Sequence, residues 1–122
     1  MVRVLLADDD AVVRRGLRAR FQLEPDILVV GEARTGAEAV TLAQALIPEV
    51  VLMDVAMPDL DGIAATAALR RAVPGCAVVM LSIHDDAQTR ARAQTAGAIA
   101  LVEKRGGTDA LLAAIRQAAQ HR

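Results

Sequence analysis

Residues 49–62, with the sequence EVVLMDVAMPDLDG, set the fold of this chain. Val50 to Met53 is an apolar run typical of strands that are buried on both faces of a parallel sheet, and Asp54 ends it. Pro58 has no N–H group and stands among aspartates before Gly62, so the chain is expected to turn out of the sheet here. Ligands of open parallel sheets bind beyond the carboxyl ends of the strands, which makes Asp54 a candidate site residue.

The composition is that of a globular domain. The 122 residues are 54% hydrophobic and 24% charged, with a net charge of -1, so we expect one domain over residues 1–122 and no nucleic-acid contact by this chain itself. No apolar stretch is long enough for a membrane span, and no cleavable signal follows Met1, so a cytoplasmic location is expected. Cys76 is the only cysteine; it cannot form an internal disulfide and is expected to be buried.

Short apolar runs alternate with helical patterns along the chain. Strands are expected at residues 2–7, 27–33, 50–54, 77–82 and 99–103. Helices are expected at residues 11–23, from a capping box at 35–38 to about 47, 63–73, 87–96, and from 108 or 109 onward. This alternation predicts an α/β fold, a five-stranded doubly wound parallel sheet between two helical layers (a three-layer αβα arrangement). The flavodoxin-like strand order 2-1-3-4-5 is common for folds of this kind.

The helix expected at residues 87–96 differs from the others in composition. It contains alanine and polar residues but no larger aliphatic side chain, and Asp85 or Asp86 is its expected N-cap. Because it can bury little apolar area, we expect it to be loosely held.

Four of the five expected strands end in residues that carry chemistry. Asp8 and Asp9 follow the first strand, Asp54 ends the third, Ser82 ends the fourth, and Lys104, the only lysine in the chain, follows the fifth. Three carboxylates in one crevice repel each other unless a cation neutralises them, and a purely oxygen donor set favours Mg²⁺. With an ammonium and a hydroxyl opposite, the implied chemistry is phosphoryl transfer to a carboxylate, giving an aspartyl phosphate.

The order and spacing of these residues resemble the receiver domain of two-component response regulators. The resemblance covers the whole chain and is carried by the pair Asp8-Asp9, the stretch Asp54–Gly62, Ser82, and Gly97-Ala98 followed by Lys104. The segment Val12–Leu17 and the lack of proline after Lys104 are similar to the NarL/LuxR-type subfamily.

The resemblance implies a role for each matched residue. Asp54 would be the phosphoacceptor. The Mg²⁺ ligands beside it would be Asp8, Asp9 and the backbone carbonyl of Ala56, and the phosphoryl contacts would be Lys104 and Ser82, with Ser82 moving on phosphorylation.

By the same resemblance, the phosphoryl donor would be the phosphohistidine of a sensor histidine kinase. The chain would be a switch that catalyses its own phosphorylation and dephosphorylation rather than an enzyme acting on a separate substrate. LuxR-type regulators carry a DNA-binding domain after the receiver, so the expected output is transcription through a domain that this chain does not contain. A homodimer is left open.

Leu101 departs from the family pattern. A tyrosine or phenylalanine usually stands three residues before the lysine, and its rotation reports the movement of the hydroxyl residue. Leucine has no ring, which supports the alternative of a receiver-like interaction module with impaired switching. Glu103 lies on the same face of this strand and would disfavour dimers built on it. We expect a trans bond between Lys104 and Arg105.

Further alternatives concern residues outside the main constellation. His84 is expected to be a solvated loop residue, with a phosphoryl contact as the alternative. Arg14, Arg15 and Arg18 are expected to form a solvated helix face, with kinase docking as the alternative. A flavin carrier is disfavoured because tryptophan and tyrosine are absent, and nucleotide binding because neither glycine-rich motif occurs. A small phosphatase is disfavoured because Pro58 stands where the pattern Asp-x-Asp needs a preceding strand.

Overall fold

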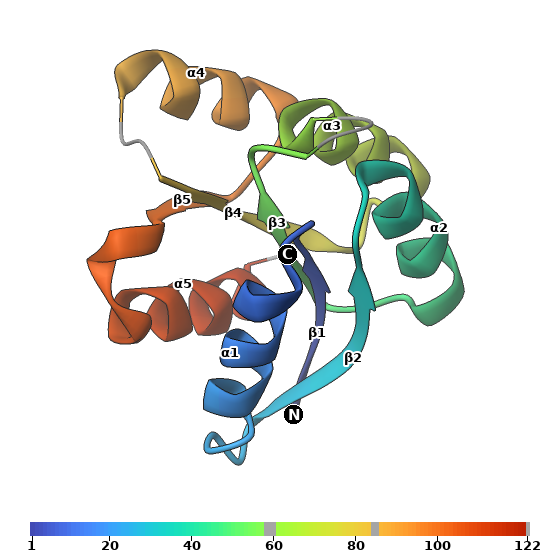
Figure 1. Ribbon diagram of the computed structural model, residues 1–122. Coiled ribbons are helices and arrows are strands. Elements are labelled where there is room, and N and C mark those ends of the chain that lie inside the picture. The colour runs from blue at the N-terminus through green and yellow to red at the C-terminus, as the bar shows by residue number, and fades with distance from the viewer. Residues whose placement is uncertain (58–60, 84–85, 122) are drawn as a thin grey trace.

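A computed structural model describes residues 1–57, 61–83 and 86–121. Within these residues, parallel strands form one five-stranded sheet in the order β2-β1-β3-β4-β5, with helices on both faces (Figure 1). The strands are β1 (Val2–Ala7), β2 (Ile27–Ala33), β3 (Val50–Asp54), β4 (Ala77–Ser82) and β5 (Ala100–Glu103). The helices are α1 (Ala11–Phe21), α2 (Gly36–Leu46), α3 (Gly62–Ala72), α4 (Ala87–Ala96), the short 3₁₀ helix η1 (Lys104–Gly106) and α5 (Thr108–Gln120). The predicted fold class and strand order are confirmed.

The predicted elements differ from the observed ones mainly at their ends. Helix α1 stops at Phe21 rather than at residue 23, and β5 begins at Ala100 rather than at residue 99. The 3₁₀ turn at Lys104–Gly106 was not predicted. Such differences of one or two residues are common because helix and strand ends lack part of the hydrogen bonding that defines the interior.

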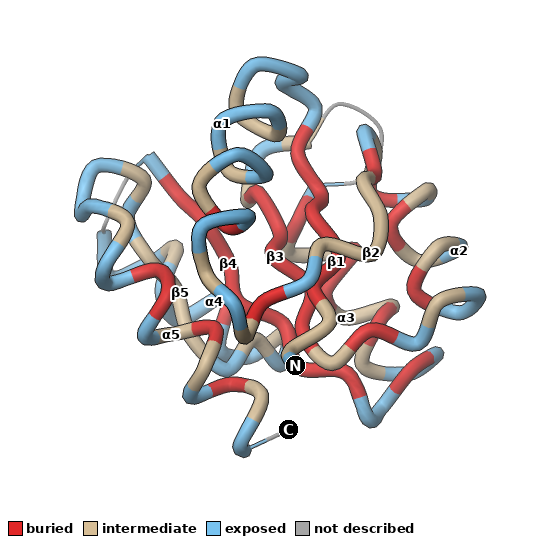
Figure 2. The backbone as a smooth tube through the Cα atoms, turned by 90° about the horizontal axis from the view of Figure 1, so that it is seen from below, coloured by how far each residue is buried: buried red, intermediate tan, exposed pale blue. Residues whose placement is uncertain are grey.

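Two apolar layers hold the helices onto the sheet. On one face, Phe21 of α1 and the apolar residues of α5 pack against the sheet, and on the other face the small buried residues of α2, α3 and α4 do so. In Figure 2 the buried strands form the centre, and the exposed residues lie on the outer sides of the helices. Helix α4 has Ala93 as its buried residue, which agrees with the small apolar area predicted for it.

Aspartates begin the helices that follow three of the strands. Asp10 caps α1 by accepting the N–H of Val12 at 2.9 Å. Asp61 and Asp86 cap α3 and α4 in the same way. Each cap satisfies N–H groups that the helix leaves unpaired and so stabilises the start of a helix shortly after the strand ends. The alternative cap Asp85 lies outside the described residues, as does His84.

Two smaller predictions, for Cys76 and for the bond between Lys104 and Arg105, are confirmed. Cys76 is buried, as predicted. The bond between Lys104 and Arg105 is trans, also as predicted. Among the described residues, no helix has the length and apolar character needed to cross a bilayer.

Candidate functional site

Three carboxylates from neighbouring strands meet at the carboxyl edge of the sheet. Strand β1 pairs with β3 so that Ala7 lies opposite Met53, and the next residues are Asp8 and Asp54. Asp9 follows Asp8 in the loop between β1 and α1. Each of these aspartates has a carboxylate oxygen within 4.8 Å of the others. The parallel register therefore gathers the three acidic residues that the sequence singled out.

Lys104 reaches this acidic group from the end of β5. Its Nζ lies 3.3 Å from Oδ2 of Asp8 and 3.3 Å from Oδ1 of Asp54. Asp8 and Asp54 are only 2% and 6% exposed, whereas Asp9 is exposed. The Lys104 ammonium thus contacts two buried carboxylates, and the third carboxylate of the group, Asp9, lies at the surface.

Burial and the neighbouring charges shift the pKa values of Asp54 and Lys104. Burial and repulsion from Asp8 raise the pKa of Asp54, and together they outweigh the opposing effects of Lys104 and the Ala56 N–H. Burial alone would lower the pKa of Lys104, but attraction by Asp54 and Asp8 outweighs burial and raises it. Lys104 is therefore held as a cation, while Asp54 is a carboxylate whose negative charge is incompletely compensated.

Backbone groups fix the direction of both buried carboxylates. Asp8 Oδ1 accepts the N–H of Asp10 at 2.9 Å, and Asp54 Oδ1 accepts the N–H of Ala56 at 3.3 Å. The chain after Asp54 is tied back to the sheet, because the Val55 N–H donates to the Leu81 carbonyl at 2.9 Å. Both acidic side chains are thus oriented by a backbone N–H two residues further along the chain.

Gly62 allows α3 to begin directly against Asp54. A Cβ atom on Gly62 would meet the backbone of both Asp54 and Val55. The Gly62 N–H donates to the Val55 carbonyl at 2.8 Å, and its own carbonyl accepts the hydroxyl of buried Thr66 at 2.7 Å. The sequence indicated only a turn at Gly62; the close approach depends on how α3 packs.

The donor set fits a hard divalent cation. Asp8, Asp9 and Asp54 offer carboxylate oxygens at mutual distances that one ion can bridge, and the described residues add neither histidine nor cysteine to this cluster. Mg²⁺ favours such oxygen donors and retains several water ligands. A cation of this kind would relieve the repulsion from Asp8 that, after burial, raises the pKa of Asp54.

Ser82 and Leu101 occupy different positions relative to the acidic group. Ser82 is buried at the end of β4, the strand next to β3, and pairs in register with Glu103. Leu101 pairs with Met80 and lines a hollow of about 300 Å³ between α4 and β5. Leu101 therefore lies further back along the sheet, where it contacts the core rather than the carboxylates.

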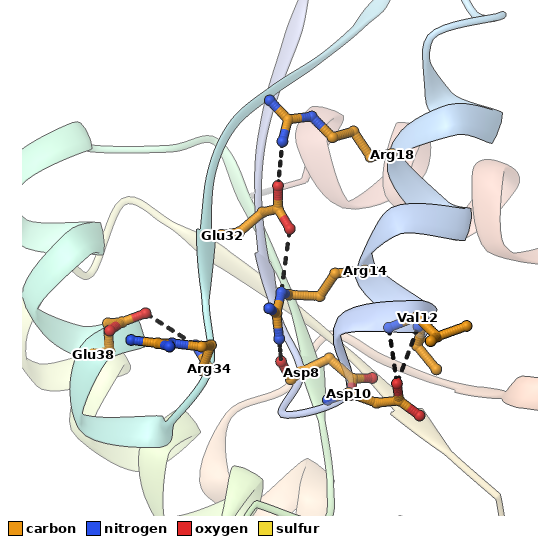
Figure 3. Close-up of polar contacts among 9 residues, drawn as sticks. Asp8, Asp10, Val12, Arg14, Arg18, Glu32, Arg34 and Glu38 are labelled. Carbon is orange, nitrogen blue, oxygen red and sulfur yellow. Dashed lines mark hydrogen bonds and ion pairs between the residues drawn. The ribbon is translucent and has the colours of Figure 1, made fainter.

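Arg14 is not part of a solvated face, so that prediction is wrong for this residue. Its side chain is 11% exposed; its Nε lies 3.2 Å from Glu32 Oε1, and its Nη1 donates to the Asp8 carbonyl at 2.6 Å (Figure 3). Arg18 pairs with the other carboxylate oxygen of Glu32 and is largely exposed. Arg15 is exposed, as predicted.

Comparison with known proteins agrees with this geometry. Residues 4–116 match the family model described as the response regulator receiver domain. The chain is 39% identical over 120 residues to the transcriptional regulatory protein LiaR of Bacillus subtilis, covering 98% of this chain and 57% of LiaR. It is also 42% identical over 106 residues to a protein-glutamate methylesterase/protein-glutamine glutaminase of Methanospirillum hungatei, covering 85% of this chain and 30% of that protein.

A solved structure shows the same fold over nearly the full chain. It is the signal receiver domain of NarL from Mycobacterium tuberculosis, with a TM-score of 0.93, 33% identity, and coverage of 99% of this chain and 98% of that one. The chain spans between about a third and somewhat more than half of the curated relatives named above. It belongs to the response regulator receiver domain family and is similar to the NarL/LuxR-type members of that family.

Proposed function

We propose that this chain is a phosphorylation-controlled switch in which Asp54 accepts a phosphoryl group from the phosphohistidine of a sensor histidine kinase. The observation that carries the proposal is the contact of Lys104 with both Asp8 and Asp54, at 3.3 Å each, beside the exposed Asp9. A buried carboxylate with incompletely compensated charge and a neighbouring fixed cation are what a phosphoryl acceptor needs.

The transfer step can be written with the residues of this site. A carboxylate oxygen of Asp54 attacks the phosphorus; an O–P bond forms while the N–P bond of the phosphohistidine breaks, and the imidazole nitrogen leaves with the electron pair and takes up a proton. In the later hydrolysis, water attacks the phosphorus, a new O–P bond forms while the bond from phosphorus to the Asp54 oxygen breaks, and the carboxylate and protonated inorganic phosphate are released. Lys104 balances charge on the phosphoryl oxygens in both steps.

Mg²⁺ is the proposed cofactor. Asp8, Asp9, Asp54 and the backbone carbonyl of Ala56 would hold it. When bound, it supplies charge neutralisation to the phosphoryl oxygens. The dense negative charge of the three aspartates is the feature that supports this assignment.

Ser82 and α4 are the proposed means by which phosphorylation changes the conformation. The buried hydroxyl of Ser82, one strand from Asp54, would hydrogen-bond a phosphoryl oxygen and shift toward it. Helix α4 follows β4 and buries little, so its position would respond at small energetic cost. Control of transcription through a DNA-binding domain outside this chain is the proposed output.

A direct test is to incubate the chain with Mg²⁺ and acetyl phosphate and to measure its intact mass. We expect the mass of one added phosphoryl group on the wild type, none after chelation of Mg²⁺, and none on Asp54→Asn. Asp109→Asn, at an exposed position in α5, is the matched control and should be labelled like the wild type. An unlabelled wild type, or equal labelling of Asp54→Asn, would refute the proposal.

Leu101 supports a second candidate, a receiver-like interaction module with impaired switching. It is half-buried beside α4, where it offers no ring to rotate and no hydroxyl. The two candidates differ in how the chain responds to phosphorylation. A working switch changes amide hydrogen exchange in α4 or changes self-association; an impaired module is phosphorylated without either change.

A further inference from the structure

A connected set of charged residues lies directly behind the acidic group. Arg14 of α1 is held between Glu32 of β2, with Nε to Oε1 at 3.2 Å, and the backbone carbonyl of Asp8, with Nη1 to oxygen at 2.6 Å. Arg18, one turn further along α1, pairs with the second carboxylate oxygen of Glu32. Figure 3 shows this chain of contacts from Arg18 through Glu32 and Arg14 to Asp8.

A shift in strand register brings Glu32 to this place. Strands β1 and β2 pair Val4 with Val29, but the register then slips by one residue, so that Leu6 pairs with Glu32. Paired residues point to the same face, and Leu6 packs in the layer that includes Phe21 of α1. The slip therefore turns Glu32 toward α1, where Arg14 meets it.

Asp8 is fixed at each of its oxygen atoms. Its Oδ1 accepts the Asp10 N–H, its Oδ2 faces Lys104, and its carbonyl accepts Arg14. The first two contacts orient the carboxylate. The backbone of Asp8 is held from the β2 side, where its N–H donates to the Ala33 carbonyl at 3.0 Å, and from the α1 side by the Arg14 side chain. Loss of Arg14 would therefore leave the carboxylate contacts in place but let the loop that carries Asp8 and Asp9 move.

The charge of Arg14 is partly offset where it lies. A lone guanidinium beside the acidic group would oppose a divalent cation, but Glu32 offsets part of that charge while it also pairs with Arg18. The pair is also well shielded, with the Arg14 side chain 11% and the Glu32 side chain 25% exposed, so it is weakened less by solvent than an open surface pair. Arg14 contacts the backbone carbonyl of Asp8, so it can support the loop without occupying a carboxylate oxygen that the metal would use.

We propose that Arg14, held by Glu32, is a positioning residue for the metal ligands Asp8 and Asp9 and sets the affinity of the site for Mg²⁺. This inference rests on the proposed function, because it takes the acidic group to be a Mg²⁺ site. The contact of Arg14 with the Asp8 carbonyl fixes the positions of Asp8 and Asp9 before the metal binds. It therefore changes the metal concentration that the site needs, and not the rate of phosphoryl transfer once the site is filled.

The test compares Arg14→Met with Arg15→Met, which removes an exposed arginine next to it on the same helix. Mg²⁺ binding is measured by isothermal titration on the full chain, and labelling by acetyl phosphate is measured over a range of Mg²⁺ concentrations. We expect Arg14→Met to weaken Mg²⁺ binding about tenfold, as is typical when a residue supporting a metal ligand is lost. At saturating Mg²⁺ its labelling rate should return to that of the wild type, and Arg15→Met should match the wild type throughout.

Hydrogen exchange of the metal-free chain gives a readout that does not depend on activity. Amides of residues 8–10 should exchange faster in Arg14→Met, while those of β3 and α5 should not change. A general loss of stability would instead raise exchange in all of these elements. If exchange rises everywhere, or if the loop is unchanged, Arg14 is not a positioning residue.

Glu32→Gln keeps the inference testable if Arg14→Met does not fold. It preserves the shape of the side chain but leaves the charge of Arg14 uncompensated, so it too should weaken Mg²⁺ binding severalfold. Unchanged Mg²⁺ affinity in both variants would overturn the role of Arg14 while leaving the proposed function intact. A wild-type chain that binds no Mg²⁺ would overturn both, which separates the two failures.

Discussion

A Cβ atom on Gly62 would overlap the backbone carbonyl oxygen of Asp54. The first residue of α3 therefore packs onto the backbone of the candidate phosphoacceptor without any side chain between them. No rotation of a side chain can relieve such a contact, because both the added Cβ and the carbonyl belong to fixed positions of the main chain. The absence of a side chain at residue 62 is thus part of how Asp54 is placed.

Gly62→Ala should destabilise the chain strongly. Either α3 or the end of β3 must move. Overpacking costs about 1–3 kcal/mol in the free energy of unfolding, and we expect the upper end of that range here because the overlap is with backbone atoms. Urea denaturation measures this change. Gly16→Ala is the control: Gly16 lies in α1 with nothing near its missing Cβ, so alanine there should raise stability by about 0.5–1 kcal/mol. Similar effects of the two substitutions would contradict the close packing of α3.

Asp54→Asn should stabilise the metal-free chain at neutral pH. Burial and Asp8 raise the pKa of Asp54 above its ordinary value of 3.8, so the folded chain binds this proton more tightly than the unfolded chain does. The folded state is therefore penalised above the raised pKa, where Asp54 is ionised, and the penalty disappears as the pH falls toward 3.8. The stabilisation by Asp54→Asn should therefore be largest at neutral pH and should shrink as the pH falls toward 3.8. Measurement of the free energy of unfolding in the presence of a chelator across this pH range checks this.

Addition of Mg²⁺ should reverse the order of stability, so that the wild type becomes more stable than Asp54→Asn. A ligand that binds only the folded state stabilises it by an amount that grows with the logarithm of its affinity, and the wild type binds more tightly because it has the full set of carboxylates. A less stable Asp54→Asn protein at pH 7 without metal would show that Lys104 already compensates the charge of Asp54.

Lys104→Met should separate metal binding from phosphoryl transfer. The ammonium now lies against the same two carboxylates that the metal needs, so its removal should strengthen Mg²⁺ binding by about tenfold. The rate of labelling by acetyl phosphate should fall by about a hundredfold, because a fixed charge at the reacting oxygens is lost. Isothermal titration and the initial labelling rate measure the two effects.

Lys104→Arg provides the conservative comparison. A planar guanidinium on a longer side chain cannot reproduce a point charge 3.3 Å from both carboxylates, so it should not restore the labelling rate. Weaker Mg²⁺ binding in Lys104→Met would mean instead that the ammonium is needed to hold the carboxylates in place.

The parts of the site that the sequence predicts are those that depend on local patterns. The apolar run before Asp54 and the cap at Asp10 can be recognised within a few residues, and parallel strands place their carboxyl ends at one edge. That is why the meeting of Asp8, Asp54 and Lys104 could be predicted before the structure was known.

The contact between Arg14 and Glu32 could not be predicted in this way. It depends on a one-residue slip between β1 and β2, and a slip of this size decides which face of the sheet a side chain takes. In the sequence, Arg14 is one of four arginines in α1, and nothing local distinguishes it from Arg15, which is exposed. The approach of Gly62 to Asp54 is similar, because it depends on the packing of α3 rather than on the turn itself.

Leu101 should tolerate a ring. It is half-buried on β5 and faces the hollow of about 300 Å³ beside Ala93 and Ala98, so phenylalanine has space to fill. Leu101→Phe should change the free energy of unfolding by less than about 1 kcal/mol, whereas Met80→Phe, at the fully buried partner position on β4, should cost about 1–3 kcal/mol. Urea denaturation compares the two, and an equal cost would mean that the hollow is closed to larger side chains.

The same variant tests whether Leu101 limits switching. A ring in this hollow would contact α4, whose buried residue there is Ala93, and would link the packing of α4 to the position of β4 and Ser82. If leucine weakens that link, phosphorylation should change hydrogen exchange in α4 more in Leu101→Phe than in the wild type. The Mg²⁺ affinity and labelling rate should remain as in the wild type, because residue 101 does not contact the carboxylates. An equally large change in both proteins would show that α4 responds to Asp54 through contacts that need no aromatic residue.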